Sequence, residues 1–300
     1  MKNETSSDDN LVLSRLFLVG CSRSGTTVVQ RTLTESYRLY SLPETDFFGL
    51  LVGGGLGAIA CRLGISRPAK VYRRAFVRLA RLLQTDALRE METHNWRLRP
   101  SIDRFVELLD GMALKADETG WLEKTPKHFR HTDLIRRFVP AAQIIYVVRR
   151  GPDVVASIRD RANRFPEQFS RQHNPDYAIK LWNRSIRAAL KDARRGQALV
   201  VMYEDFVDDH EAIVRTIGEL LNLQRRRGGT DKLPGIIDIS EQWKSNSSAA
   251  VRQASSKFTQ VFDVDTRNLI LKKLNTQAYD ALASFAISPS SIPAVNKKNH

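Results

Sequence analysis

Short apolar runs alternate along this chain with longer segments of helical periodicity. Three runs have the length of buried strands, at 15–19, 144–148 and 198–202, and a fourth strand is expected at 38–42. Helix-like segments, in which apolar side chains recur every three or four positions, follow these runs. This alternation predicts an α/β fold, with a central parallel sheet flanked by helices.

Helices are expected between and after these strands. The predicted ranges are 25–36, 69–92, 101–114, 130–138, 152–163, 175–195, 208–222 and 265–285. We interpret residues 13–287 as a single domain, because a chain of 300 residues suits one large α/β domain. The polar tails 1–12 and 288–300 are predicted to be disordered. A glycine-rich stretch, 53–57, is expected to be a flexible loop on the substrate side.

Basic residues outnumber acidic ones in this chain, and this excess indicates which classes of ligand it binds. Lys and Arg total 47 against 33 Asp and Glu, a net charge of +14, which favours polyanionic ligands or acidic acceptors. The chain has no zinc-finger spacing, aromatic RNA motif or basic helix–turn–helix, so no nucleic-acid partner is expected. No apolar run is long enough for a membrane span, and the polar residues 1–10 do not resemble a signal peptide. We therefore expect a cytoplasmic protein, and two cysteines, Cys21 and Cys61, do not suggest a disulfide framework.

The first strand runs into a loop that contains two glycines. Gly20 ends the apolar run and Gly25 precedes a helix start, so loop amides and the helix N-terminus can cradle an oxyanion. A nucleotide-triphosphate loop reads GxxxxGK[ST], but Thr26 stands here where that motif has lysine. The loop is therefore predicted to hold a phosphate-like group, with Arg23 as the available cation.

A second anion site is predicted at the end of another strand. Arg149 and Arg150 directly follow the apolar run 144–148, and a Gly-Pro turn then leads into a helix. Because open parallel sheets bind ligands at the carboxyl ends of their strands, the two cationic strand ends should converge on one ligand.

Together these segments resemble the sulfotransferases that use 3′-phosphoadenosine 5′-phosphosulfate (PAPS). Ser22–Thr27 is similar to the family's 5′-phosphosulfate loop, and Val148–Ser157 to its 3′-phosphate motif. Glu123–Pro126 resembles the lysine-containing segment that precedes the 3′-phosphate strand, and Val200–Phe206 resembles the strand with a nucleotide-contacting tyrosine. The resemblance extends from about residue 15 to 260 and is nearest to the bacterial and Golgi tyrosylprotein or carbohydrate branches.

The resemblance implies a P-loop-like sulfotransferase architecture, PAPS as cofactor and adenosine 3′,5′-bisphosphate as its product. The residues expected to hold the cofactor are Ser22, Arg23, Ser24, Gly25, Thr26, Thr27, Arg149, Ser157, Arg161 and Tyr203. Trp243–Ser248 is similar to the family segment that closes over the cofactor. No metal is required, since Asp46, Asp117 and Glu118 are scattered carboxylates rather than a ligand set.

Two residues are candidates for catalysis. Glu44, after the second strand, matches the catalytic glutamate of the tyrosylprotein branch, with His128 as the rival general base. Lys124 is expected, in a loop, to stabilise the charge on the leaving oxygen.

The acceptor hydroxyl is not defined by the sequence; it could belong to a carbohydrate, a peptide tyrosine, a lipid or a small natural product, possibly an anionic one. The oligomeric state is also open, a homodimer being one option.

Four arginines of the helix at 69–92 form either a solvated face or a docking surface for an anionic acceptor: Arg73, Arg74, Arg78 and Arg81. The alternatives to sulfotransfer are a P-loop kinase, and a non-catalytic protein that binds anionic polymer or nucleic acid.

Overall fold

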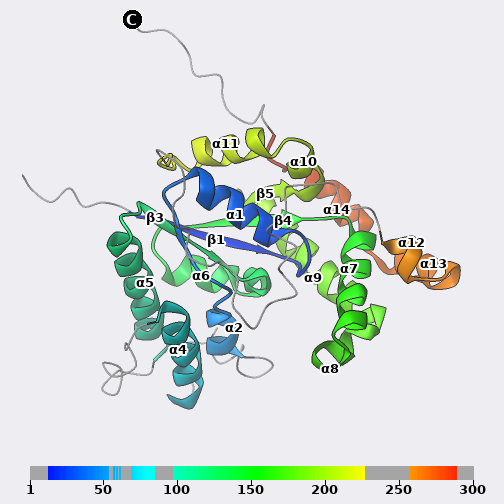
Figure 1. The fold of residues 1–300 in the computed structure, drawn as a ribbon, viewed down its shortest axis with the longest axis horizontal. Coiled ribbons are helices and arrows are strands. Elements are labelled where there is room, and N and C mark those ends of the chain that lie inside the picture. The colour runs from blue at the N-terminus through cyan, green and yellow to red at the C-terminus, as the bar shows by residue number, and fades with distance from the viewer. Residues whose placement is uncertain are drawn as a thin grey trace, which may run out of the picture.

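The computed structural model (Figure 1) describes most of the chain. The described residues are 13–53, 57, 59, 61, 69–84, 97–226 and 257–288. The expectations for residues 1–12, 54–56, 85–92, 243–248 and 289–300 lie outside them.

Five parallel strands form a central sheet in the order β2-β3-β1-β4-β5. Their bounds are β1 Ser14–Gly20, β2 Tyr40–Ser41, β3 Gly120–Lys124, β4 Ala142–Val148 and β5 Leu199–Met202. Because β1 lies in the middle, with β3 and β4 as its neighbours, the loop that follows it emerges at the centre of the sheet's carboxyl edge.

Helices cover both faces of this sheet (Figure 1). The first half of the chain contributes α1 Thr26–Ser36, α2 Phe47–Val52, α4 Ala69–Leu83, α5 Leu98–Lys115, the 3₁₀ helix η2 Pro126–Arg130 and α6 Thr132–Phe138. The second half contributes α7 Gly151–Arg164, α8 Pro166–Phe169, the 3₁₀ helix η3 Ser170–His173, α9 Pro175–Arg194, α10 Tyr203–Asp208, α11 His210–Leu220, α12 Phe258–Val261, α13 Val264–Lys273 and α14 Thr276–Ala283. The predicted α/β fold with a central parallel sheet flanked by helices is confirmed.

The two faces of the sheet bury separate hydrophobic cores, because successive strand residues point to opposite sides. Leu16 and Leu18 of β1 pack with α1 and α11. Phe17 and Val19 point the other way, into the larger core formed with α2, α4, α5 and α9. Both faces are therefore fully covered, which is the arrangement expected of a parallel sheet.

The structure differs from the sequence expectations in several elements. The apolar pattern does not predict the strand β3, because this strand ends in two charged residues, Glu123 and Lys124, that are nonetheless buried. The expected strand 38–42 shortens to two residues. The expected helix 265–285 is divided by Asn275, whose side chain accepts a hydrogen bond from the Ala278 amide and begins a new helix.

Gly20 is required where β1 pairs with Val147 of β4. A Cβ at this position would lie 2.4 Å from the carbonyl oxygen of Val147, a backbone atom that the sheet holds in place. We predict that Gly20→Ala lowers the free energy of unfolding by about 3 kcal/mol, as overpacking against a rigid neighbour does.

Gly111 provides the matched control for this substitution. It lies exposed in the interior of α5, and a Cβ added there would meet no neighbouring atom within 4 Å. Gly111→Ala should instead stabilise the protein by about 0.5–1 kcal/mol, by helix propensity. Chemical denaturation of both variants measures the difference, and equal effects would contradict the close approach at Gly20.

Candidate active site

Every strand of the sheet leads at its carboxyl end to a residue that the sequence placed in the site. These residues are Arg23 after β1, Glu44 after β2, Lys124 ending β3, Arg149 after β4 and Tyr203 after β5. A parallel sheet brings such residues to one edge although they lie far apart in sequence. Tyr203 is the first residue of α10 rather than part of a strand.

The loop between β1 and α1 has the strained, glycine-dependent backbone of an anion cradle. Arg23 adopts a left-handed conformation with φ 74°, and Gly25 has φ 91°. A Cβ on Gly25 would lie 2.2 Å from the ring of Tyr203, so the glycine is needed for contact with this ring. Ser24 and Thr26 are buried, and no described group hydrogen-bonds to the Ser24 hydroxyl. Such an orphaned buried hydroxyl suits a ligand oxygen.

The remaining loop positions, Ser22 and Thr27, are half-buried beside these residues. Cys21 is buried, and burial raises the pKa of its thiol to about 12, against the opposing effect of nearby cations such as Arg130. It is therefore uncharged at neutral pH and would not repel an anion.

Arg23 of this loop lies near arginines that follow β4 and that belong to α7. Arg23 Nε donates a 3.1 Å hydrogen bond to Ser157 Oγ on α7, which joins the two predicted anion-binding segments directly. The Arg149 guanidinium lies over the Tyr203 ring, 4.7 Å from its centre. Burial, followed by the charges of Arg161, Arg164 and Arg149, lowers the pKa of Arg23 to about 10. Arg23 is still cationic at neutral pH, so binding of an anion would relieve the repulsion within this cluster.

Arg161 of α7 has partners of its own beside this cluster. It contributes to the positive field at Arg23, but its Nη2 donates a 2.7 Å hydrogen bond to Gln172 and its guanidinium lies over the Phe169 ring. These contacts hold the side chain toward α8 and η3.

Lys124 and Glu44 form an ion pair at the carboxyl ends of β3 and β2. The Lys124 Nζ lies 2.9 Å from Glu44 Oε1; the lysine side chain is fully buried, whereas that of Glu44 is 22% exposed. A buried ammonium is strongly unfavourable unless it is paired, so Glu44 stabilises Lys124 in place. The expectation that Lys124 lies in a loop is wrong, because it is the last residue of a buried strand.

The sequence did not reveal a buried hydrogen-bond network that holds the neighbours of this ion pair in place. Glu123 Oε1 accepts from the hydroxyls of Thr45 at 2.7 Å and Thr125 at 2.6 Å, the neighbours of Glu44 and Lys124. Burial raises the pKa of Glu123, but His128 and these hydroxyl donors lower it, and the net shift is downward. In the sequence, this network is indicated only by the position of Glu123 directly before Lys124.

His128 belongs to the same network. Its Nδ1 lies 3.0 Å from Glu123 Oε2, and its Nε2 accepts from the Phe48 amide at 3.2 Å. The Phe48 contact requires a lone pair on Nε2, so the ring proton is on Nδ1 and is donated to Glu123. Both ring nitrogens of the rival base are therefore engaged inside the protein.

The scattered carboxylates stay apart. Asp117 pairs with Arg38, and Glu118 pairs with Arg226. Both carboxylates come just before β3 begins, so they lie at the opposite edge of the sheet from Asp46. Within the described part of the chain, no group of three His, Cys, Asp or Glu residues is placed to hold a metal ion.

Among the described residues, no helix is long and apolar enough to cross a membrane.

Comparison with known proteins identifies the family. A model of the sulfotransferase family matches residues 15–227, which include each predicted site residue. The chain belongs to the sulfotransferase family. No match is found among curated proteins.

Solved sulfotransferases resemble this family member in structure. The sulfotransferase domain from the curacin biosynthetic pathway is 16% identical, with a TM-score of 0.50 over 91% of this chain and 97% of that one. The sulfotransferase domain of the Synechococcus PCC 7002 olefin synthase is 20% identical, with a TM-score of 0.49 over 97% and 100% of the two chains. A sulfotransferase from Mycobacterium avium is 15% identical, with a TM-score of 0.49 over 92% and 78%. At 16% identity, the likeness to the domain from the curacin pathway shows a shared fold.

The buried ion pair leads to a prediction for the stability of this sulfotransferase. Glu44→Gln should lower the free energy of unfolding by about 2 kcal/mol, less than the ~3–5 kcal/mol of a fully enclosed pair, because Glu44 is partly exposed. The double variant Glu44→Gln/Lys124→Met should recover most of this loss, since it removes the unpaired charge. Urea denaturation measures both, and a double variant as unstable as the single one would show that Glu44 does not support the lysine charge.

Proposed function

We propose that this sulfotransferase moves a sulfuryl group from PAPS to an acceptor hydroxyl and releases adenosine 3′,5′-bisphosphate. The observation that carries the proposal is the Arg23–Ser157 hydrogen bond, which joins the 5′-phosphosulfate-like loop to the 3′-phosphate-like helix. Family membership supports the transfer itself, and the clustered arginines support a donor that has several negative charges.

The residues beside the loop fit this cofactor. Arg149 and Ser157 would hold the 3′-phosphate, and the loop amides with the orphaned Ser24 hydroxyl would hold the 5′-phosphosulfate. Tyr203, stacked between Gly25 and Arg149, would contact the nucleotide.

The Glu44–Lys124 pair would supply the catalytic groups. Bound PAPS supplies an activated sulfuryl group with a phosphate oxygen as its leaving atom. Glu44 would accept the proton of the acceptor hydroxyl as the new oxygen–sulfur bond forms, and the old bond to the phosphate oxygen breaks. Lys124 would stabilise the negative charge left on that oxygen. An anion bound beside Lys124 would share its charge, and Glu44 would then be freer to act as base.

The first prediction of this mechanism concerns the 3′-phosphate. Arg149→Ala should weaken adenosine 3′,5′-bisphosphate by about 2–4 kcal/mol, the loss expected for a charge-assisted contact in a shielded site. Binding of adenosine 5′-monophosphate, which lacks the 3′-phosphate, should barely change. Arg150→Ala is the matched control, because that side chain is exposed and pairs with Asp153 and Glu204.

Isothermal titration calorimetry of the three proteins with both nucleotides makes the comparison. Equal losses for both nucleotides would remove Arg149 from the 3′-phosphate site. Binding of ATP with magnesium in place of the bisphosphate would favour the kinase alternative. We also expect transfer from PAPS to continue in the presence of a chelator, because Arg23 and Lys124 provide positive charge in place of a metal.

The second prediction concerns the base. Glu44→Gln should lower kcat by about 10²–10⁴, the usual range for loss of a general base, while the bisphosphate affinity stays nearly unchanged. Lys124→Ala should lower kcat by about 10²–10³, and it should also weaken cofactor binding. His128→Ala should reduce kcat less than either, because its ring nitrogens are engaged by Glu123 and Phe48.

Steady-state kinetics at a temperature where all variants are folded decides between the two bases. Glu35→Gln on α1 serves as a control for the loss of a carboxylate elsewhere. Loss of turnover in His128→Ala, together with an active Glu44→Gln, would show that Glu44 is not the base.

A further inference from the structure

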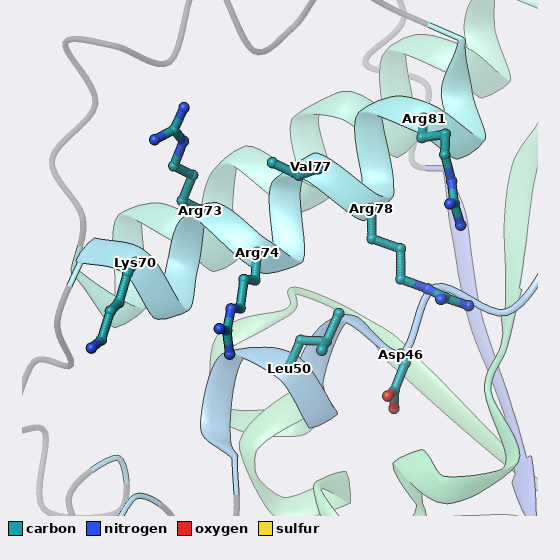
Figure 2. Close-up of a pocket in the computed structure, with 8 residues that line it drawn as sticks. All are labelled: Asp46, Leu50, Lys70, Arg73, Arg74, Val77, Arg78 and Arg81. Carbon is teal, nitrogen blue, oxygen red and sulfur yellow. The ribbon is translucent and has the colours of Figure 1, made fainter.

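A basic groove lies beside the proposed active site, between α2 and α4 (Figure 2). Its cavity measures about 550 Å³ and is lined by Asp46, Leu50, Lys70, Arg73, Arg74, Val77, Arg78 and Arg81. We call this the α4 groove. Five of the eight lining side chains are cationic, and Asp46 is the single carboxylate among them.

The sequence of α4 concentrates its cations on the groove side. At 100° per residue, positions 70, 73, 74, 77, 78 and 81 fall within an arc of about 140°. Tyr72, Ala75, Phe76, Leu79 and Leu83 occupy the opposite arc and are buried in the core. The helix is thus anchored by its apolar side and presents its cations to the groove.

These cations are not neutralised within the helix. Ala69–Leu83 contains no acidic residue, and Lys70, Arg74 and Arg78 follow one another at four-residue spacing, about 6 Å apart along the axis. Like charges at this spacing repel one another and destabilise a helix slightly. No carboxylate among the described residues pairs with Lys70 or Arg74.

Asp46 balances only part of this charge: burial raises the pKa of its carboxyl overall, although the charge of Arg78 is among those that lower that pKa. Its carboxylate turns toward α2, where Oδ1 lies 2.4 Å from the position of a Cβ on Gly49, and Figure 2 shows it pointing away from Arg78. The groove therefore holds cations, Lys70 and Arg74 among them, that an anionic ligand would pair with.

The α4 groove is joined to the proposed base by direct contacts. Arg78 Nη2 donates a 2.8 Å hydrogen bond to the carbonyl oxygen of Glu44. The Asp46 amide, two residues further along, donates to Thr125 Oγ1, next to Lys124. A molecule in the groove would thus lie against the segment that carries Glu44.

We propose that the α4 groove binds the acceptor through anionic groups, and that the acceptor is a small molecule with at least two carboxylate, phosphate or sulfate-ester groups besides its hydroxyl. The inference rests on the proposed function for the hydroxyl, but the anion site itself is independent of it. Two groups are inferred because the cations follow one another about 6 Å apart, too far for one group to reach them all. A small acceptor is inferred because the groove volume of about 550 Å³ is in the range of small-molecule sites.

The test uses fructose 1,6-bisphosphate as a probe with two anionic groups, and fructose as its neutral counterpart. Binding is measured by calorimetry on the full chain, with adenosine 3′,5′-bisphosphate present in excess to occupy the cofactor site. The bisphosphate should bind, more weakly as salt is raised, and fructose should not.

Matched charge reversals locate the site. Lys70→Glu/Arg74→Glu changes two groove cations, and Arg187→Glu/Lys272→Glu changes two exposed cations on α9 and α13 by the same net charge. The groove variant should bind the bisphosphate roughly 30-fold more weakly, whereas the control should change less than about threefold. Affinity of both variants for adenosine 3′,5′-bisphosphate alone should equal that of the wild type.

The outcomes separate this inference from the proposed function. Equal weakening in both double variants, or equal binding of fructose, would overturn the groove as an anion site. Binding of a long sulfated heparin chain without binding of fructose 1,6-bisphosphate would overturn the small acceptor. If wild-type protein fails to bind adenosine 3′,5′-bisphosphate, the proposed function fails, while loss of probe binding in the groove variant would still locate the anion site.

Discussion

A fully buried lysine charge is the constraint on which the active-site region depends. Lys124 ends the strand β3 inside the protein, where an unpaired ammonium would be strongly unfavourable. Glu44 neutralises it from the end of β2, and the Glu123 network ties the residues next to both partners together. The segment that follows β2 is held in one position because the Glu44 charge and the Thr45 hydroxyl both have partners on β3.

The same constraint connects the interior to the surface. The Glu44 carbonyl accepts from Arg78, so the segment that stabilises Lys124 also docks the basic helix α4. Phe48, which follows that segment on α2, donates its amide to His128 and packs in the large core. A charge inside the sheet thus determines where the groove and the proposed base lie relative to each other.

The sequence by itself determined the strand–helix alternation, the parallel sheet and the two cationic strand ends. Each of these depends on local pattern: apolar runs, glycines at a turn, and arginines directly after a strand. Topology then brought Arg23 and Ser157 together, although 134 positions separate them in the chain. A parallel sheet makes that convergence predictable, because all its strands end at one edge.

Only the tertiary structure decided the burial and the partners of Glu123, Lys124 and His128. Charged residues at the end of a short apolar run look like a loop, since burial of a charge depends on partners that are distant in sequence. The sequence also left open whether the α4 arginines form a solvated face or a docking surface. Helical spacing can place side chains on one face, but only packing against α2 turns that face into a groove.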